Sequence, residues 1–200
     1  MLHKFEIPKE IYKELLKIVE DKSIKANKTL LGNIREEYSL NKHMKYFENF
    51  ILSKIGESDF LVNYLNNLKI FEPNPQKLVL NSMWVNYQKK YEFNPVHTHG
   101  GVFSFIMFVK IPFTIEEEKN KSPGIESIRN LSGHLSFLYI DPNAVGQIGL
   151  HDIPVDKTWE GTGLIFKSSL NHMVYPFFSE GERITVSGNI FFDNKELNKR

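Results

Sequence analysis

The stretch that decides the fold is LVLNSMWVNYQKKYEFNPVHTHGGVFSFIMFVKI, residues 78–111, in which short β-branched and aromatic runs are interrupted by Asn, Pro and Gly. Similar runs continue toward the C-terminus, a texture typical of an all-β sandwich or barrel. We expect strands near Leu78–Tyr87, Val102–Ile111, His134–Ile140, Gly163–Phe166, His172–Tyr175 and Ile184–Phe192. Short strands at this spacing predict a jelly roll.

The chain before residue 77 has helical periodicity instead. Apolar residues recur at helical spacing and predict two amphipathic helices, carried by Ile11, Leu15, Ile18 and Val19 and then by Phe47, Phe50, Ile51 and Ile55. Gly56 is a plausible helix end, and Phe60–Leu68 is expected to form a third, shorter helix. The predicted fold class is therefore mainly β with N-terminal helices (α+β). We expect residues 1–76 to pack on the sheet of a jelly-roll core at 77–200, within one structural domain.

Composition excludes several classes of function. The formal net charge is +1 with both signs mixed along the chain, so we expect no nucleic-acid partner. The chain contains no cysteine, which excludes disulfides, thiolate metal sites and cysteine nucleophiles. Charged residues follow the start too soon for a secretory signal, and no apolar run approaches the roughly 20 residues of a membrane span. We expect a cytoplasmic protein without a membrane partner.

His97-Thr98-His99 is the sharpest local feature of the sequence. In an extended chain, residues i and i+2 project to the same face, so both imidazoles can reach one metal ion about 2 Å from each ring. Gly100 and Gly101 follow directly and would leave room beside that ion for a small ligand. An isolated pair of this kind is also compatible with ordinary surface histidines.

A second group of candidate residues lies toward the C-terminus. His172 begins a predicted strand, Arg183 follows eleven residues later, and Thr185 comes two residues after that. In a two-strand excursion this spacing can bring the chain back alongside His172, with the guanidinium pointing into the same cavity. A buried arginine in a barrel requires an anion. The pattern is therefore typical of a metal site beside an anion site.

These motifs resemble, in order and rough spacing, the 2-oxoglutarate/Fe(II)-dependent oxygenase superfamily, and in particular the prolyl-4-hydroxylase-like oxygenases of the HxH variant found in marine phage and bacteria. The resemblance covers about Asn81 to Phe192, and a weaker similarity extends over Leu31–Tyr38. It is carried by Trp84-Val85-Asn86-Tyr87, His97-x-His99, Gly163-Leu164-Ile165-Phe166 with His172, and Arg183-Ile184-Thr185.

The resemblance implies a double-stranded β-helix with Fe(II) bound by His97 and His172. It also implies that Arg183, assisted by Thr185, grips the distal carboxylate of 2-oxoglutarate. The usual motif has a carboxylate where this chain has His99, and we expect His99 to be the third ligand, as in the HxH branch. The implied activity is that of a dioxygenase, which hydroxylates a small-molecule or peptide substrate with O2 and releases succinate and CO2.

Residues 84–87 supply further candidates. Trp84 and Asn86 share one face of their strand and Tyr87 the other, so either Asn86 or Tyr87 could contact the co-substrate, whereas Trp84 is expected to pack. The long polar segment Thr114–Asn130 is expected to be a loop, either a lid over the substrate or a plain surface connection. The sequence leaves the oligomeric state open.

Three alternatives remain open from the sequence. A cupin-type metal protein also has HxH, but it requires a Glu a few residues later, and this chain has none there. A zinc site of three histidines and water gives Arg183 no role. A jelly roll that binds a ligand without catalysing a reaction is compatible with a histidine, His99, at the position of the usual carboxylate.

Overall fold

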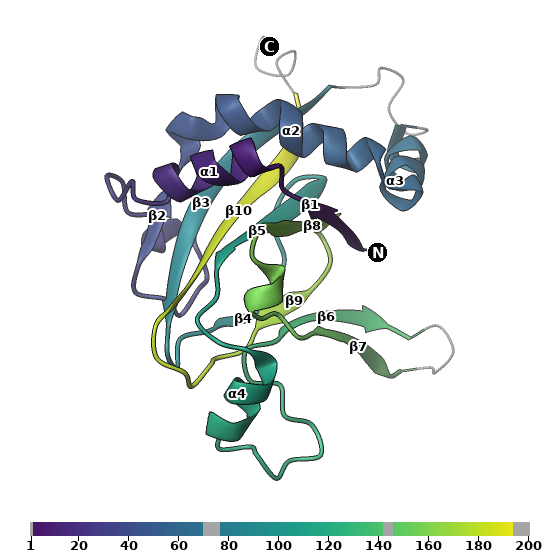
Figure 1. The fold of residues 1–200 in the computed structure, drawn as a ribbon. Coiled ribbons are helices and arrows are strands. Elements are labelled where there is room, and N and C mark those ends of the chain that lie inside the picture. The colour runs from purple at the N-terminus through teal and green to yellow at the C-terminus, as the bar shows by residue number, and fades with distance from the viewer. Residues whose placement is uncertain (1, 70–76, 142–145, 194–200) are drawn as a thin grey trace.

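A computed structural model describes residues 2–69, 77–141 and 146–193, in which two antiparallel sheets face each other. Helices cover the outer face of the larger sheet, and the smaller sheet lies against its inner face (Figure 1). This arrangement confirms the expected jelly roll. The six predicted strands are all present, with ends that differ from the predicted ones by a few residues.

The two sheets divide the strands unevenly. In spatial order the larger sheet contains β1 (Leu2–Glu6), β8 (Thr162–Lys167), β5 (Phe103–Lys110), β10 (Glu182–Phe192), β3 (Leu78–Lys89) and β2 (Glu37–Ser39). The smaller sheet contains β4 (Asn94–His97), β9 (His172–Val174), β6 (Leu135–Ile140) and β7 (Ile148–Ile153). Every pair of neighbouring strands is antiparallel.

The three helices expected in the N-terminal region are present as α1 (Lys9–Ile18), α2 (Met44–Gly56) and α3 (Asp59–Lys69). Their buried apolar residues form one cluster with the outer face of the larger sheet. A fourth helix, α4 (Ile115–Lys121), and short 3-10 turns at Asn27–Thr29, Asn41–His43 and Lys157–Trp159 complete the described elements. None of the helices in the described residues is long and apolar enough to cross a membrane.

The N-terminal region also contributes strands, which its helical periodicity did not predict. β1 pairs with β8 and β2 pairs with β3, so residues 1–76 supply both edge strands of the larger sheet. These pairings join segments that are far apart in the sequence, and three- or five-residue strands carry little periodic signal of their own. The N-terminal region is therefore part of the sheet as well as its cover.

Alternation along the central strands separates a dry face from a polar one. On β10, Ile184, Val186 and Ile190 belong to the cluster beneath the helices. The intervening residues of β10, and their counterparts on β3, face the smaller sheet and line a cavity: Arg183, Thr185, Ser187, Asn189, Trp84, Asn86 and Gln88. A second apolar cluster between the sheets, which includes Phe108, Phe137 and Phe166, closes the rest of this interior.

The segment Thr114–Asn130, which we expected to be a loop, contains a helix. Thr114 and Glu117 form a capping box, in which each side chain bonds to the backbone N–H of the other residue, and α4 begins at this cap. Glu118 is fully buried and accepts hydrogen bonds from the N–H groups of Phe178 and Ser179. The first half of the segment is thus a capped helix that is anchored to the body of the protein.

Candidate metal centre

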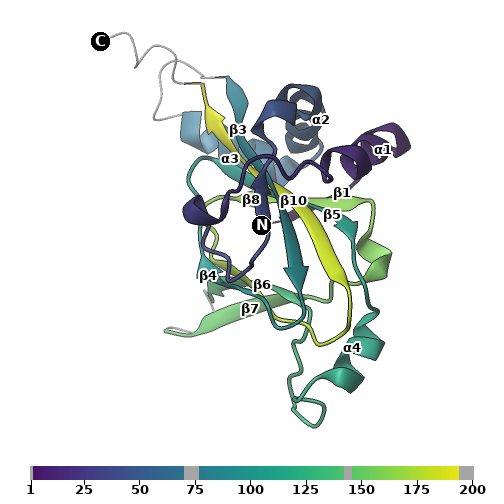
Figure 2. The same cartoon turned by 90° about the vertical axis from the view of Figure 1, so that its left-hand side faces the viewer.

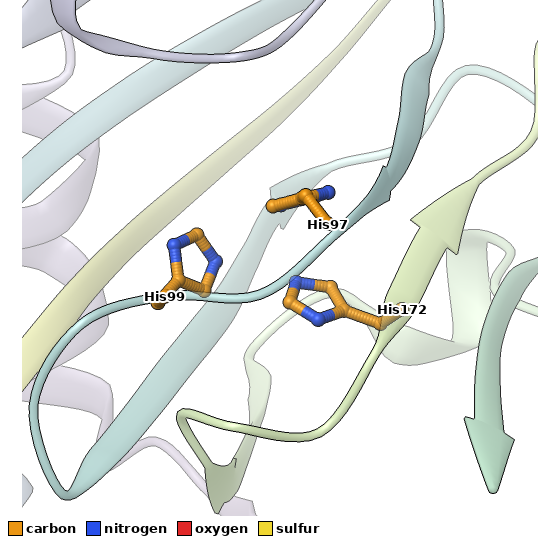
Figure 3. Close-up of side chains that lie close together, drawn as sticks. All are labelled: His97, His99 and His172. Carbon is orange, nitrogen blue, oxygen red and sulfur yellow. The ribbon is translucent and has the colours of Figure 1, made fainter.

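His97, His99 and His172 converge at one point between the two sheets (Figure 3). His97 ends β4, His99 lies in the turn that follows, and His172 begins β9. β4 and β9 are neighbours in the smaller sheet, with His97 directly opposite His172. Strand pairing therefore joins the predicted chelating pair to a histidine 75 residues further along the chain.

The three rings are close enough to share one ion. Ring centroids are 4.9 Å apart for His97 and His99, 4.2 Å for His97 and His172, and 5.0 Å for His99 and His172. One nitrogen from each ring lies within 4.8 Å of the other two. Two nitrogens that bind one ion at about 2.1 Å, at an angle of about 90–110°, are about 3.0–3.4 Å apart. The three nitrogens are therefore near the separation of ligands to one ion, and the side chains would rotate inward to bind it.

Backbone carbonyls set the tautomers of two of the rings. His97 Nδ1 lies 2.7 Å from the carbonyl oxygen of Pro95, and His172 Nδ1 lies 2.9 Å from that of Leu170. A carbonyl can only accept, so each Nδ1 carries the proton and each Nε2 keeps a free lone pair. Histidines that bind metals are commonly held in this way by their other ring nitrogen.

Burial keeps the three imidazoles unprotonated near neutral pH. Removal from water lowers the pKa of His99 to about 4 and that of His172 to about 3, with a smaller contribution from the nearby His97. Burial also lowers the pKa of His97. Neutral imidazole is the form that donates to a metal, so the site requires no proton loss at pH 7.

The turn that carries His99 is held by its backbone and by β10. The His99 N–H donates to the Ser168 carbonyl at 2.9 Å. Gly101 has φ +94°, and a Cβ there would lie 2.7 Å from the Ile190 carbonyl oxygen. We expected Gly101 to leave room for a ligand; instead it is required by the turn and by its contact with β10. Gly100, in contrast, does line the cavity.

A cavity of about 270 Å³ connects the three histidines with the polar face of the larger sheet. Asn86, Thr185 and Arg183, which the sequence predicted to contact a co-substrate, all line this cavity. Trp84 also lines it, with its ring 5.6 Å from that of His99, although we expected Trp84 only to pack. Arg183 reaches this cavity from the sheet opposite His172, and not from a strand alongside it.

Arg183 is 2% exposed and is held by neutral acceptors. Its Nε and Nη2 donate to Gln88 Oε1 at 3.1 and 2.6 Å, Nη1 donates to the Gly133 carbonyl at 2.7 Å, and Nη2 also donates to the Tyr175 carbonyl at 3.2 Å. Burial lowers the pKa of Arg183 to about 10, an effect that Glu118 opposes only in part. Among the described residues no carboxylate forms an ion pair with Arg183. A guanidinium that faces a cavity without a counter-ion fits an anionic ligand.

Tyr87 does not reach the cavity, so our expectation of a co-substrate contact was wrong for this residue. It belongs to the cluster beneath the helices, where its ring lies 6.1 Å from that of Tyr38 and 4.0 Å from Lys22 Nζ. Alternation along β3 places Asn86 inward and Tyr87 outward. The same alternation could have identified Gln88, two residues beyond Asn86, which we did not predict.

One part of the cavity wall comes from the N-terminal region. Residues 29–32 and Ile34 line it, together with Glu37 of β2. This segment lies beside the start of β4, where Asn33 and Phe93 form an isolated bridge (Figure 2). No residue of Thr114–Asn130, for which a lid and a surface connection were both left open, lines this cavity. This part of the cavity wall is therefore formed by the N-terminal region and not by Thr114–Asn130.

Comparisons with known proteins agree with this architecture. HygX from Streptomyces hygroscopicus, solved with nickel, 2-oxoglutarate and hygromycin B bound, superposes with a TM-score of 0.54 at 11% identity, covering 96% of this chain and 83% of that one. A Pseudomonas putida prolyl-4-hydroxylase superposes with a TM-score of 0.53 at 12% identity, covering 96% of this chain and 92% of that one. An oxidoreductase of the 2OG-Fe(II) oxygenase family from Burkholderia pseudomallei superposes with a TM-score of 0.50 at 11% identity, covering 94% of this chain and 84% of that one. At these identities the likeness concerns the fold alone.

No curated protein sequence matches the chain. The sequence profile of a family described as "Putative 2OG-Fe(II) oxygenase" matches residues 82–189, which is more than half of the chain. The matched region contains the three converging histidines together with Asn86, Arg183 and Thr185. The chain therefore belongs to the 2OG-Fe(II) oxygenase family.

Proposed function

We propose that the protein is an Fe(II)- and 2-oxoglutarate-dependent dioxygenase that hydroxylates its substrate and releases succinate and CO2. One observation carries the proposal: three neutral imidazoles and a buried arginine without a counter-ion line the same cavity. The imidazoles suit a divalent cation, and the arginine suits a carboxylate. The two groups together match a metal that is bound with an anionic co-substrate.

The donor set of the site fits ferrous iron. His97, His99 and His172 would hold the ion through nitrogens whose lone pairs are already free, with two of the rings oriented by backbone carbonyls. Three neutral ligands leave the whole 2+ charge on the ion. The ion would then keep open positions for the co-substrate and O2.

Arg183 would bind the distal carboxylate of 2-oxoglutarate, and Thr185 and Asn86 line the cavity beside it. Gln88 orients the guanidinium but adds no charge, so the attraction for an incoming anion is retained. Asn86 Oδ1 is buried without a hydrogen-bond partner, and as an acceptor it is not satisfied by the carboxylate of 2-oxoglutarate.

Iron and 2-oxoglutarate, when bound, supply the activation of O2: one oxygen atom enters succinate and the other enters the hydroxylated substrate. The protein orients the reactants and keeps water out. The apolar side chains of Phe108, Leu135, Val155 and Phe166 line the cavity beside the polar groups and provide this dry wall.

Anaerobic titration tests the proposal. With Fe(II) present, addition of 2-oxoglutarate should produce the weak visible charge-transfer band of a 2-oxoacid chelated to ferrous iron. His97→Ala and His172→Ala should abolish the band because each removes a ligand. His134→Ala is the matched control, since His134 is about as buried as His172 and is also bonded to a backbone carbonyl, but does not line the cavity. Absence of the band in the wild-type protein would refute the assignment.

The ligand set by itself suits a second function, because three histidines without a carboxylate also bind zinc. A zinc centre would be indifferent to 2-oxoglutarate and would leave the buried Arg183 without a role. The two functions are separated by the amount of succinate formed: the oxygenase requires both Fe(II) and 2-oxoglutarate for it, whereas zinc-loaded protein forms none.

A further inference from the structure

A buried carboxyl group lines the same cavity, outside the part of the chain that matches the family. Glu37 of β2 is 1% exposed, and no Lys, Arg or His nitrogen of the described residues forms an ion pair with it. Its neighbour in sequence, Glu36, lies in contrast within salt-bridge distance of both Lys22 and Lys89. Acidic side chains are rarely buried without a partner, so Glu37 requires an explanation.

The hydrogen bonds inside the protein do not satisfy this carboxyl group. Glu37 Oε2 accepts one bond from Asn27 Nδ2, at 3.2 Å, and Oε1 accepts none from the described residues. A carboxylate has about four acceptor positions, so most of its capacity is unused. The group is held in place while its second oxygen is left available.

Further acceptors lie around the same spot. A Cβ built on Gly32 would be 2.6 Å from Glu37 Oε1 and 2.5 Å from Asn94 Oδ1, so both oxygens lie beside the space that this glycine leaves open. Asn94 Oδ1 is buried without a partner, and so is Asn86 Oδ1. Asn86 lies directly opposite Glu37 in the β2–β3 pairing. Three oxygens that lack donors thus line one corner of the cavity.

The electrostatics of this corner favour a positive ligand. Burial, together with the charge of Glu92, raises the pKa of Glu37 to about 7. A cation placed against the carboxylate would offset that desolvation, and its N–H groups would supply the missing donors. An anion would be repelled, and an apolar group would leave all three oxygens unpaired.

We infer that Glu37, Asn86 and Asn94 form a subsite for a primary ammonium group of the substrate. This inference rests on the proposed function and deepens it by naming the substrate class as an amine. Asn94 and His97 are three residues apart on β4, which corresponds to about 10 Å of strand. The ammonium would therefore be anchored at a distance from the metal while another part of the substrate is presented there.

The binding of a simple cation tests this inference. The probe is butylammonium chloride, with 1-butanol as its neutral counterpart, added to the isotope-labelled full chain at pH 8 and followed by NMR. We expect saturable shifts at the backbone amides of Gly32, Glu37 and Asn94 with butylammonium and none with butanol. Equal responses to both probes, or no response to either, would overturn the inference.

Substitutions assign the effect to the carboxylate. Glu37→Gln should lower the affinity for butylammonium at least about ten-fold, because the side chain loses its charge and keeps its shape. Gly32→Ala should weaken it too, because the added methyl group occupies the space beside both oxygens. Glu36→Gln, which removes a carboxylate that is already paired, should leave binding unchanged. Binding to Glu37→Gln at wild-type strength would show that the carboxyl group serves only the fold.

The readout is independent of the proposed oxygenase activity. The titration is performed first without added metal and then with Zn(II) and 2-oxoglutarate, so neither iron nor turnover is required. If the charge-transfer band of the iron complex is absent but ammonium still binds, the oxygenase proposal fails alone. If the band forms and ammonium does not bind, the amine inference fails alone.

Discussion

Gln88 Oε1 accepts hydrogen bonds from both Nε and Nη2 of Arg183, at 3.1 and 2.6 Å. The side-chain amide thus occupies the position that a carboxylate takes in an arginine ion pair. It fixes the guanidinium in the cavity wall without forming an ion pair with it. Its own Nε2 donates to the backbone carbonyls of Glu92 and Tyr175, so Gln88 is held at both ends.

Gln88→Glu should therefore weaken the binding of 2-oxoglutarate. The new carboxylate would pair with Arg183 and compete with the co-substrate, which we expect to lower its affinity by at least about ten-fold, or about 1.4 kcal/mol. Fe(II) affinity should not change. The charge-transfer titration measures both, and Gln147→Glu, the same change at an exposed position, is the control. Wild-type affinity in Gln88→Glu would contradict the role of Gln88.

Trp84 provides an intrinsic reporter of the metal centre, since its ring lies 5.6 Å from that of His99. The only other tryptophan, Trp159, packs against Phe108 and Lys4 and does not line the cavity. In a Trp159→Phe variant, paramagnetic Ni(II) should quench most of the remaining fluorescence and diamagnetic Zn(II) much less. Equal effects of the two ions would place the metal away from Trp84.

Glu37 should make the stability of the protein depend on pH. Its folded-state pKa of about 7 lies above the ordinary value of 4.5, so folding favours the protonated form. The stability that the raised pKa of Glu37 contributes is fully present below pH 4.5 and is lost as the pH rises to about 7. We expect Glu37→Gln to gain stability relative to wild type across that window and to keep a constant advantage above it. Urea unfolding of both proteins between pH 4 and 9 measures the difference, and a flat difference would contradict this pKa.

Thr114→Ala should destabilise the protein without affecting the site. The Thr114 side chain caps α4, and loss of such a cap costs about 1 kcal/mol. Because α4 does not line the cavity, the affinity for 2-oxoglutarate should be unchanged. Ser53→Ala, in the middle of α2, should change the free energy of unfolding by less than about 0.5 kcal/mol. A loss of co-substrate binding in Thr114→Ala would revive the idea that this segment is a lid.

Much of the architecture followed from local pattern. The apolar stripes of α1 and α2 and six of the ten described strands (β3, β5, β6, β8, β9 and β10) were predicted, because helical and strand periodicities are properties of adjacent residues. The pair His97 and His99 was predicted for the same reason, since the alternation of an extended chain places both on one side. The capped start of α4 was missed although Thr114 and Glu117 have capping-box spacing.

The N-terminal contribution to the site could not be read in this way. β2 has only three residues, and it brings Glu37 to the cavity by pairing with a strand about fifty residues later. Nothing in the surrounding sequence indicates that this carboxyl group would be buried or that it would lie beside Asn86. Long-range pairing decided both its environment and its pKa.

By itself, the sequence determined which residues alternate along each element, and hence that Asn86 and Tyr87 lie on opposite faces of their strand. The tertiary structure decided which of those faces is which: the helices cover the Tyr87 face, and the smaller sheet encloses the Asn86 face as a cavity. It also brought His172 opposite His97 and placed Arg183 across from them without a counter-ion. The physical reason is that periodicity is local, whereas burial depends on which distant segments pack together.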